Sequence, residues 1–130
     1  MKSFTDLKQS KKLAEILPHY TADNTWERVT IAGSNLNVPE EQQYVHNGNM
    51  PFCYYSGIGI PCWSLAALLS VLPSVIKRND KRMFLTLEKA GAYNLYYKSN
   101  DRLDELWETD FEPIDACYKM ILDLHEQKLL

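Results

Sequence analysis

The chain has 130 residues, of which 45% are hydrophobic and 24% are charged, and its formal net charge is −3. This composition is typical of one globular domain and excludes a disordered chain. The small negative charge gives no global basic field, so only a local patch could drive binding to nucleic acid or to an anionic membrane. The charged N-terminus without an apolar core is not a secretory signal, and we expect a cytoplasmic protein.

The first half of the chain predicts one helix followed by extended or irregular segments. Ser3 or Thr5 can cap the helix, and Pro18 ends it. In "NTWERVTIAG", Val29 and Ile31 alternate with polar residues, which predicts a short strand. Residues at about 34–60 are rich in Asn, Gly, Pro, Gln and Tyr and predict an irregular segment, which is uncharged from residue 42 onward.

The stretch "PCWSLAALLSVLPSVI", residues 61–76, predicts the second helix, which begins after Pro61 or is capped by Ser64 and ends at Pro73. Its two prolines and its length, below the roughly 20 residues of a spanning helix, argue against a membrane segment. We expect its uncharged small-residue side to be covered by the preceding segment or by a second subunit of a homo-oligomer. The apolar stripe is formed by Leu65, Leu68, Leu69 and Leu72, and the small-residue side by Ala66, Ala67, Ser70 and Val71.

The second half predicts a sheet and a final helix. After the linker "KRNDKR", the segment "MFLTLEKAGAYNLYYKS" predicts a hairpin that turns at Ala90 and Gly91, and "DELWETD" predicts a third strand. The last helix begins near Pro113, and its apolar face is formed by Cys117, Met120, Ile121 and Leu124. The predicted fold is therefore a single α+β domain, residues 1–130, in which an antiparallel hairpin or three-stranded sheet packs in two layers with about three helices.

Three segments, "QSKKLAEILPHYTADNTW", "PCWSLAALLSVLP" and "EPIDACYKMILDLHEQKLL", resemble a family of small uncharacterised proteins encoded by phages, prophages and conjugative elements of gut bacteria. The resemblance covers the three predicted helices and carries no known activity, ligand or site residue. It implies an accessory protein of a mobile element that acts inside the bacterial cell.

Patterns for catalysis or for metal and phosphate binding are incomplete. Cys62, near the start of the second predicted helix, could be an activated nucleophile, but nothing places His19, His46 or His125 beside it. The three cysteines, with Cys53 and Cys117, are widely spaced and fit reduced thiols. A zinc site at His46, Cys53 and Cys62 lacks close Cys pairs, and "GIGIPCW" lacks the rest of a phosphate-binding loop. We therefore expect no cofactor and no metal.

Two charged clusters are the candidate binding sites. The basic linker could contact phosphates if it lay beside Lys98 and the hairpin tyrosines on an exposed sheet face, although it also suits solvated flanks of a strand. The acidic strip "NDRLDELWETDFEPID" could bind a basic protein or mimic nucleic acid, with Trp107 as a hot spot. The candidate residues are Lys77, Arg78, Lys81 and Arg82 in the linker, and Asp104, Glu105, Trp107 and Glu108 in the strip.

These patterns favour a non-catalytic protein that binds another macromolecule, most simply a host or phage protein. The first alternative is nucleic-acid binding through the basic linker and the tyrosine-rich hairpin. The second is a small enzyme that uses Cys62 or the acidic strip, for example through paired carboxylates at Asp104 and Glu108.

Overall fold

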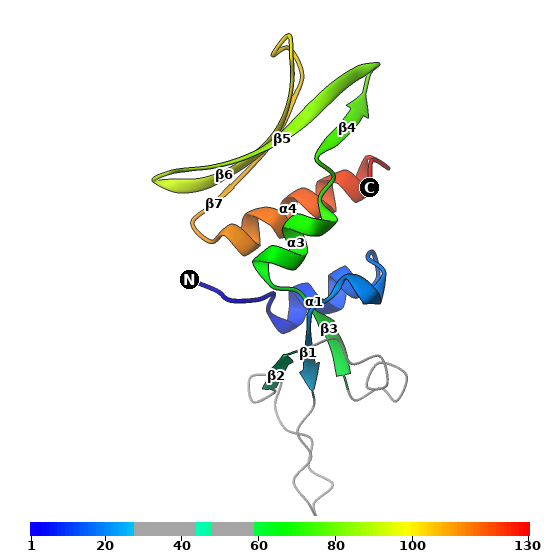
Figure 1. The fold of residues 1–130 in the computed structure, drawn as a ribbon, viewed down its shortest axis with the longest axis vertical. Helices are drawn as coiled ribbons and strands as arrows, with labels where there is room; N and C mark the ends of the chain where they lie inside the picture. The colour runs from blue at the N-terminus through cyan, green and yellow to red at the C-terminus, as the bar shows by residue number, and fades with distance from the viewer. Residues whose placement is uncertain (28–43, 48–58) are drawn as a thin grey trace, which may run out of the picture. The chain divides into compact units, whose positions relative to one another are not determined.

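The computed structural model describes residues 1–27, 44–47 and 59–130. Its contacts divide the chain into two compact units: the N-terminal unit, residues 4–67, and the C-terminal unit, residues 1–3 and 68–130. The described residues contain three α-helices and two antiparallel sheets, so the predicted α+β class is confirmed (Figure 1). Whether residues 1–130 act as a single domain stays a prediction.

The N-terminal unit contains a short helix and a sheet of three strands. The helix α1 spans Leu7–Ala14 and is followed by the 3-10 turn η1, His19–Thr21. The strands are β1, Asn24–Glu27, β2, Tyr44–Asn47, and β3, Gly59–Cys62, in the antiparallel order β2-β1-β3. Two strands thus form within or at the end of the segment that the sequence predicted to be irregular. Val29 and Ile31, on which the strand prediction rested, lie outside the described residues.

The predicted caps of the first helix, Ser3 and Thr5, are wrong. Asp6 is the N-cap: its Oδ1 accepts from the backbone N–H of Gln9 at 2.7 Å, and the Gln9 side chain accepts from the Asp6 N–H at 3.0 Å. Thr5 instead donates its backbone N–H to the carbonyl of Trp63 at 2.9 Å. A reciprocal capping box satisfies two N–H groups at once, and a cap at Thr5 would place Lys8, which has no acceptor, at the third helical position.

Trp63 anchors the centre of the N-terminal unit. Its side chain is fully buried, and its Nε1–H donates to Thr21 Oγ1 at 2.9 Å. The next residue caps α3, Leu65–Val71, since the N–H of Ala67 donates to Ser64 Oγ at 3.2 Å. The predicted Ser64 cap is therefore confirmed, and the boundary between the units falls within α3.

Burial on the second predicted helix follows the leucine stripe in part. Leu68 and Leu72 are buried, and Ala67 on the small-residue side is buried as well. Ala66 and Ser70 are exposed. Because residues 48–58 lie outside the described part of the chain, cover by that segment or by a second subunit stays a prediction.

The C-terminal unit contains a four-stranded antiparallel sheet in the order β4-β5-β6-β7 and the helix α4. The predicted hairpin, third strand and last helix are confirmed. The fourth strand was missed because "KRNDKR" is a tight turn between β4 and β5 rather than a linker, with Asn79 and Asp80 at φ 53° and 61°. The elements are β4, Val75–Arg78; β5, Lys81–Ala90; β6, Ala92–Ser99; β7, Glu105–Asp110; and α4, Pro113–Glu126.

The core of this unit lies between α4 and one face of the sheet, along which α4 runs in Figure 1. The predicted apolar face of α4 is fully buried, and so are Met83, Leu95 and Tyr97 of the sheet. The hydroxyl of Tyr97 donates to the carbonyl of Pro73 at 2.6 Å, so its burial leaves no unpaired donor. No helix within the described ranges is both long and apolar enough to cross a bilayer.

The β4–β5 turn gives a direct test of this register. Two positive φ angles are the requirement of a type I′ hairpin, for which Asn-Gly is the preferred pair. Replacing Asp80 with Gly should therefore stabilise the protein by about 0.5–1 kcal/mol in urea unfolding, because a left-handed residue loses its steric penalty. Asp80→Ala, which keeps a Cβ at the same φ, should give no gain. Equal effects of the two substitutions would contradict the turn assignment.

Candidate functional site

The face of the sheet opposite α4 is called here the outer face. Strand alternation places Phe84, Tyr96 and Trp107 on it, while Leu95 and Tyr97 point into the core. Phe84 is 39% exposed and Trp107 is 44% exposed, so both rings are partly open to solvent. Large aromatic side chains left open on a sheet are unusual for a surface without a binding role. The outer face also carries Val75, Lys77, Arg82, Thr86, Glu88, Asn94, Lys98, Glu105 and Thr109.

The central feature of the outer face is a stacked pair of aromatic rings. Tyr96 and Trp107 are cross-strand neighbours, with ring centroids 4.8 Å apart and planes within 5°. Lys98 Nζ lies 5.1 Å from the centroid of Tyr96. A flat ring pair with a cation beside it suits a ligand that is both aromatic and anionic.

The basic linker is divided between the two faces of the sheet. Arg78 lies on the core side, where its NH1 donates to Gln127 Oε1 at 3.0 Å and its NH2 lies 3.6 Å from Asp104. Lys81 forms an ion pair with Asp101 at 2.9 Å. The four cations of the linker are close in sequence, but the strands place two of them on each face of the sheet.

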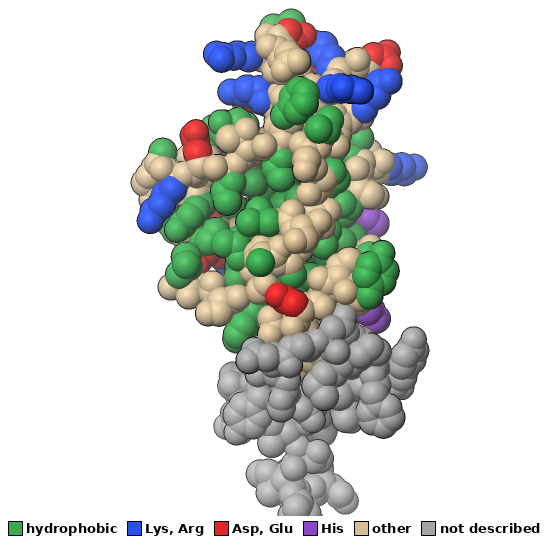
Figure 2. All heavy atoms as spheres, viewed as in Figure 1, with side chains coloured by type: hydrophobic (Ala, Val, Ile, Leu, Met, Phe, Trp, Pro, Cys, Tyr) green, Lys and Arg blue, Asp and Glu red, His purple; other side chains and the backbone are tan. Residues whose placement is uncertain are grey.

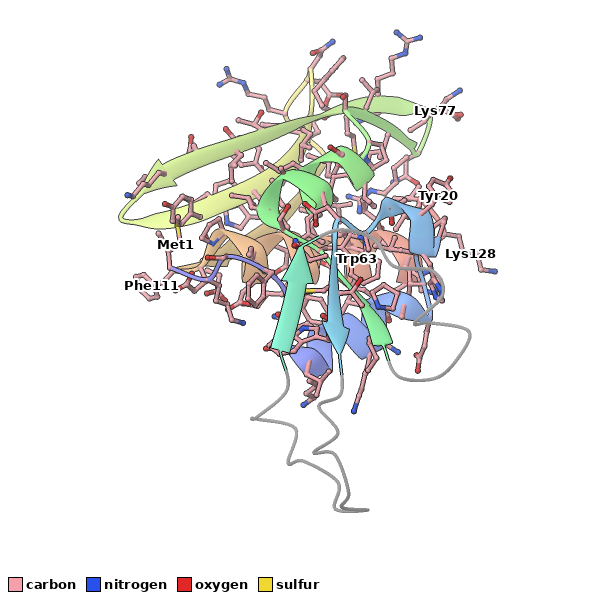
Figure 3. The ribbon with its side chains drawn as sticks, turned by 60° about the horizontal axis from the view of Figure 1, so that its bottom comes forward. Met1, Tyr20, Trp63, Lys77, Phe111 and Lys128 are labelled. Atoms are coloured by element: carbon pink, nitrogen blue, oxygen red, sulfur yellow. The ribbon has the colours of Figure 1, made fainter. Side chains whose placement is uncertain are left out.

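Lys77 and Arg82 are opposite each other on the outer face, at the same end of the sheet as Phe84. Lys77 points into solvent from β4 (Figure 3). Lys and Arg side chains gather at the end of the C-terminal unit that carries the β4–β5 turn (top of Figure 2). Among the described residues neither Lys77 nor Arg82 forms an ion pair. The outer face thus keeps cations that are available to an anionic partner.

The predicted acidic strip does not form one acidic surface. Glu105 lies on the outer face, 3.5 Å from Lys98, whereas Asp104 lies within 3.6 Å of Arg78 and 3.8 Å of Lys81. Further along, Asp110 pairs with Lys119 at 2.8 Å, and Asp115 pairs with Lys2 at 2.8 Å. These cations are distant in sequence from the acidic strip, within which Arg102 is the one basic residue. Its charge is largely compensated inside the unit.

Glu108 lies on the side of β7 that faces α4. Burial, together with the hydrogen bond and the charge of Asp123 on α4, raises its pKa from 4.5 to about 7, while Lys119 opposes the shift. The two predicted carboxylates Asp104 and Glu108 have different partners and do not act as a pair. The raised pKa favours the protonated form of Glu108, which can donate a hydrogen bond to Asp123; we call this pair the proton-holding contact between the sheet and α4.

Cys62 has no access to solvent, and burial raises the pKa of its thiol to about 11. Both properties oppose a nucleophilic role, because the reactive species is the thiolate. In "GIGIPCW", the described residues Gly59–Cys62 form β3 and pair with β1, so this part of the segment is strand and not a phosphate-binding loop. Cys53 and the side chain of His46 lie outside the description, and no group of three possible metal ligands occurs in the described part of the chain.

Part of the site escaped the sequence analysis. Tyr93, Tyr96 and Tyr97 were grouped with Lys98, yet the hairpin register places only Tyr96 beside Lys98 on the outer face. Phe84 was not considered, although its alternation with Met83 and Leu85 indicates the opposite face. Comparisons of the chain with known protein families, with curated proteins and with solved structures find no match.

The pKa of Glu108 predicts a pH dependence of stability. Because this pKa is higher in the folded than in the unfolded chain, the contribution is complete below about 4.5 and is lost as the pH rises through about 7. In Glu108→Gln the amide can donate to Asp123 without titrating. The free energy of unfolding in urea should then fall less between about pH 5 and pH 8 than in the wild type.

Glu105→Gln is the matched control, since Glu105 is on the same strand but on the outer face. Subtracting each variant's pH profile from that of the wild type removes the contribution of the histidines. A wild-type profile that Glu108→Gln leaves unchanged would contradict the proton-holding contact with Asp123.

Proposed function

We propose that this chain binds single-stranded nucleic acid through the outer face of the C-terminal unit, without catalysing a reaction. The observation that carries the proposal is the Tyr96–Trp107 stack, with centroids 4.8 Å apart and an exposed Trp107 ring, on the same face as Lys77 and Arg82, which have no acidic partner among the described residues. Exposed bases stack on aromatic side chains, and nearby lysine and arginine side chains contact the phosphates. This combination on a sheet face is a recurrent way to hold a single strand.

The local charge supports this ligand in spite of the net charge of −3. On the outer face Lys77 and Arg82 lie at one end, and Lys98, which pairs with Glu105 at 3.5 Å, stands between the rings and that end. Glu88 lies toward the opposite end of the face, opposite Asn94. A strand that lies on the rings therefore meets positive charge on one side, which gives it a favoured direction.

A duplex is a poorer ligand for the same surface. Its bases are already stacked on one another, so Tyr96 and Trp107 could gain a base contact only if the pairing were opened. Among the described residues, the outer face is made of strands and offers no helix that could enter a major groove. We therefore expect a preference for single strands.

Binding of a host or phage protein, the first prediction from the sequence, stays a second hypothesis. Trp107 is exposed, as a hot-spot residue must be. The acidic strip, however, was expected to attract a basic partner, and its carboxylates form ion pairs with Lys2, Lys81 and Lys119 of the same unit. The resemblance to phage, prophage and conjugative-element proteins supports the further proposal that the chain is an accessory protein of a mobile element acting in the bacterial cytoplasm.

The direct experiment is fluorescence anisotropy of a labelled single-stranded oligonucleotide at low salt. Wild-type protein should give saturable binding, and Trp107→Ala should weaken it about ten-fold, because stacking of a base on an aromatic ring contributes about 1–3 kcal/mol. Phe111→Ala is the matched control, since Phe111 is an exposed aromatic residue (81%) in the connection between β7 and α4, outside the sheet. Absence of binding, or equal losses in both variants, would sink the proposal.

The salt dependence tests the role of the cations. Each phosphate contact in a single strand contributes about 0.7 to the slope of log K against log salt concentration. Arg82→Gln should reduce this slope by about that amount. Lys89→Gln should leave it unchanged, because Lys89 lies on the opposite side of β5, over the ring of Tyr93. A slope that falls in Lys89→Gln and not in Arg82→Gln would contradict binding of the nucleic acid on the outer face.

A further inference from the structure

One end of the outer face is hollowed into an open pocket of about 490 Å³. Two aromatic rings, Phe84 and Tyr96, form its floor on the sheet, and two cations, Lys98 and Arg102, stand in its wall. Its lining contains no acidic residue, and Glu105, which lies 3.5 Å from Lys98, is outside the lining. The remaining lining residues are Thr86, Ser99 and Asn100; Thr86 and Asn100 supply a hydroxyl and an amide group, whereas the Ser99 hydroxyl is bonded to Asp101.

Arg102 is held in the pocket by the β6–β7 loop, residues 100–104. Its φ is 59°, which lies in the left-handed region that non-glycine residues seldom adopt. The backbone N–H of Arg102 donates to the Ser99 carbonyl at 3.0 Å, and the N–H of Leu103 donates to Asp101 Oδ1 at 3.0 Å. The loop therefore fixes the backbone at Arg102, and with it the point from which the side chain leaves the chain.

Asp101, the nearest acid in sequence, is already occupied by the loop. Ser99 Oγ donates to its Oδ1 at 2.5 Å, and Lys81 Nζ lies 2.9 Å from its Oδ2. The hydrogen bond from Ser99 above all holds the pKa of Asp101 well below its usual range, with help from Leu103 and Lys81. Within the described residues Arg102 has no ion pair. The positive charge of the Arg102 guanidinium is therefore available to a ligand.

We infer that this pocket is a nucleotide subsite, in which a base lies against Phe84 and Tyr96 and its phosphate lies between Lys98 and Arg102. The inference rests on the proposed function and deepens it by placing one nucleotide of the strand. The volume is within the range of small-ligand pockets, about 300–1,000 Å³. A guanidinium with a second cation suits phosphate, and the 5.1 Å between Lys98 Nζ and the Tyr96 centroid keeps base and phosphate sites adjacent.

The test uses adenosine 5′-monophosphate and adenosine as probes, titrated into the full chain at low salt and followed by NMR chemical shifts. The monophosphate should bind about ten-fold more tightly than the nucleoside, since charge-assisted hydrogen bonds contribute about 1.5–3 kcal/mol. In Arg102→Gln this preference should disappear. Lys128→Gln is the matched control, because Lys128 is also a cation at φ 59° but is not part of the pocket.

The outcomes separate the two proposals. Equal affinity for both probes in the wild type, or an unchanged preference in Arg102→Gln, would overturn the subsite even if the oligonucleotide bound through Trp107. A preference that is lost in Arg102→Gln, together with no binding of the oligonucleotide, would support the pocket and reject the single-strand function. Thermal unfolding of both variants shows whether a lost preference reflects a lost fold.

Discussion

The packing of α4 against one face of the β4–β7 sheet is the constraint on which the rest of the C-terminal unit depends. Burial of Leu95 and Tyr97 beneath the helix fixes the register of β6. Because side chains alternate along a strand, the same register sends Tyr96 and Lys98 to the other side. A slip of one residue would bury a lysine and expose a leucine. The aromatic outer face is therefore a consequence of how the core is packed.

This constraint also explains why neither charged cluster behaves as a unit. The β4–β5 turn places Lys77 and Arg82 outward and Arg78 and Lys81 inward. The inward pair then compensates Asp101 and Asp104, while Lys77 and Arg82 keep their positive charge on the outer face. Charge separation across a thin sheet lets a chain of net charge −3 present a basic edge.

The sequence predicted the elements whose signals are local. The stripe on α4, the hairpin turn at Gly91 and the cap at Ser64 each follow from residues a few positions apart. It did not predict the fourth strand, because Asn79-Asp80 is a weak turn signal, nor the ion pairs between Lys2, Lys81 or Lys119 and the acidic strip. The site could be predicted only in part: Trp107 and the linker cations were named, but their grouping required the register.

The central claim is that the outer face, and no other surface, holds the ligand. Chemical-shift mapping of amide groups during titration with a single-stranded oligonucleotide tests it most directly. The account predicts changes concentrated at Phe84, Tyr96, Lys98, Arg102 and Trp107, with those of α4 much smaller. Changes centred on α4 or on the N-terminal unit, or no changes at all, would contradict it.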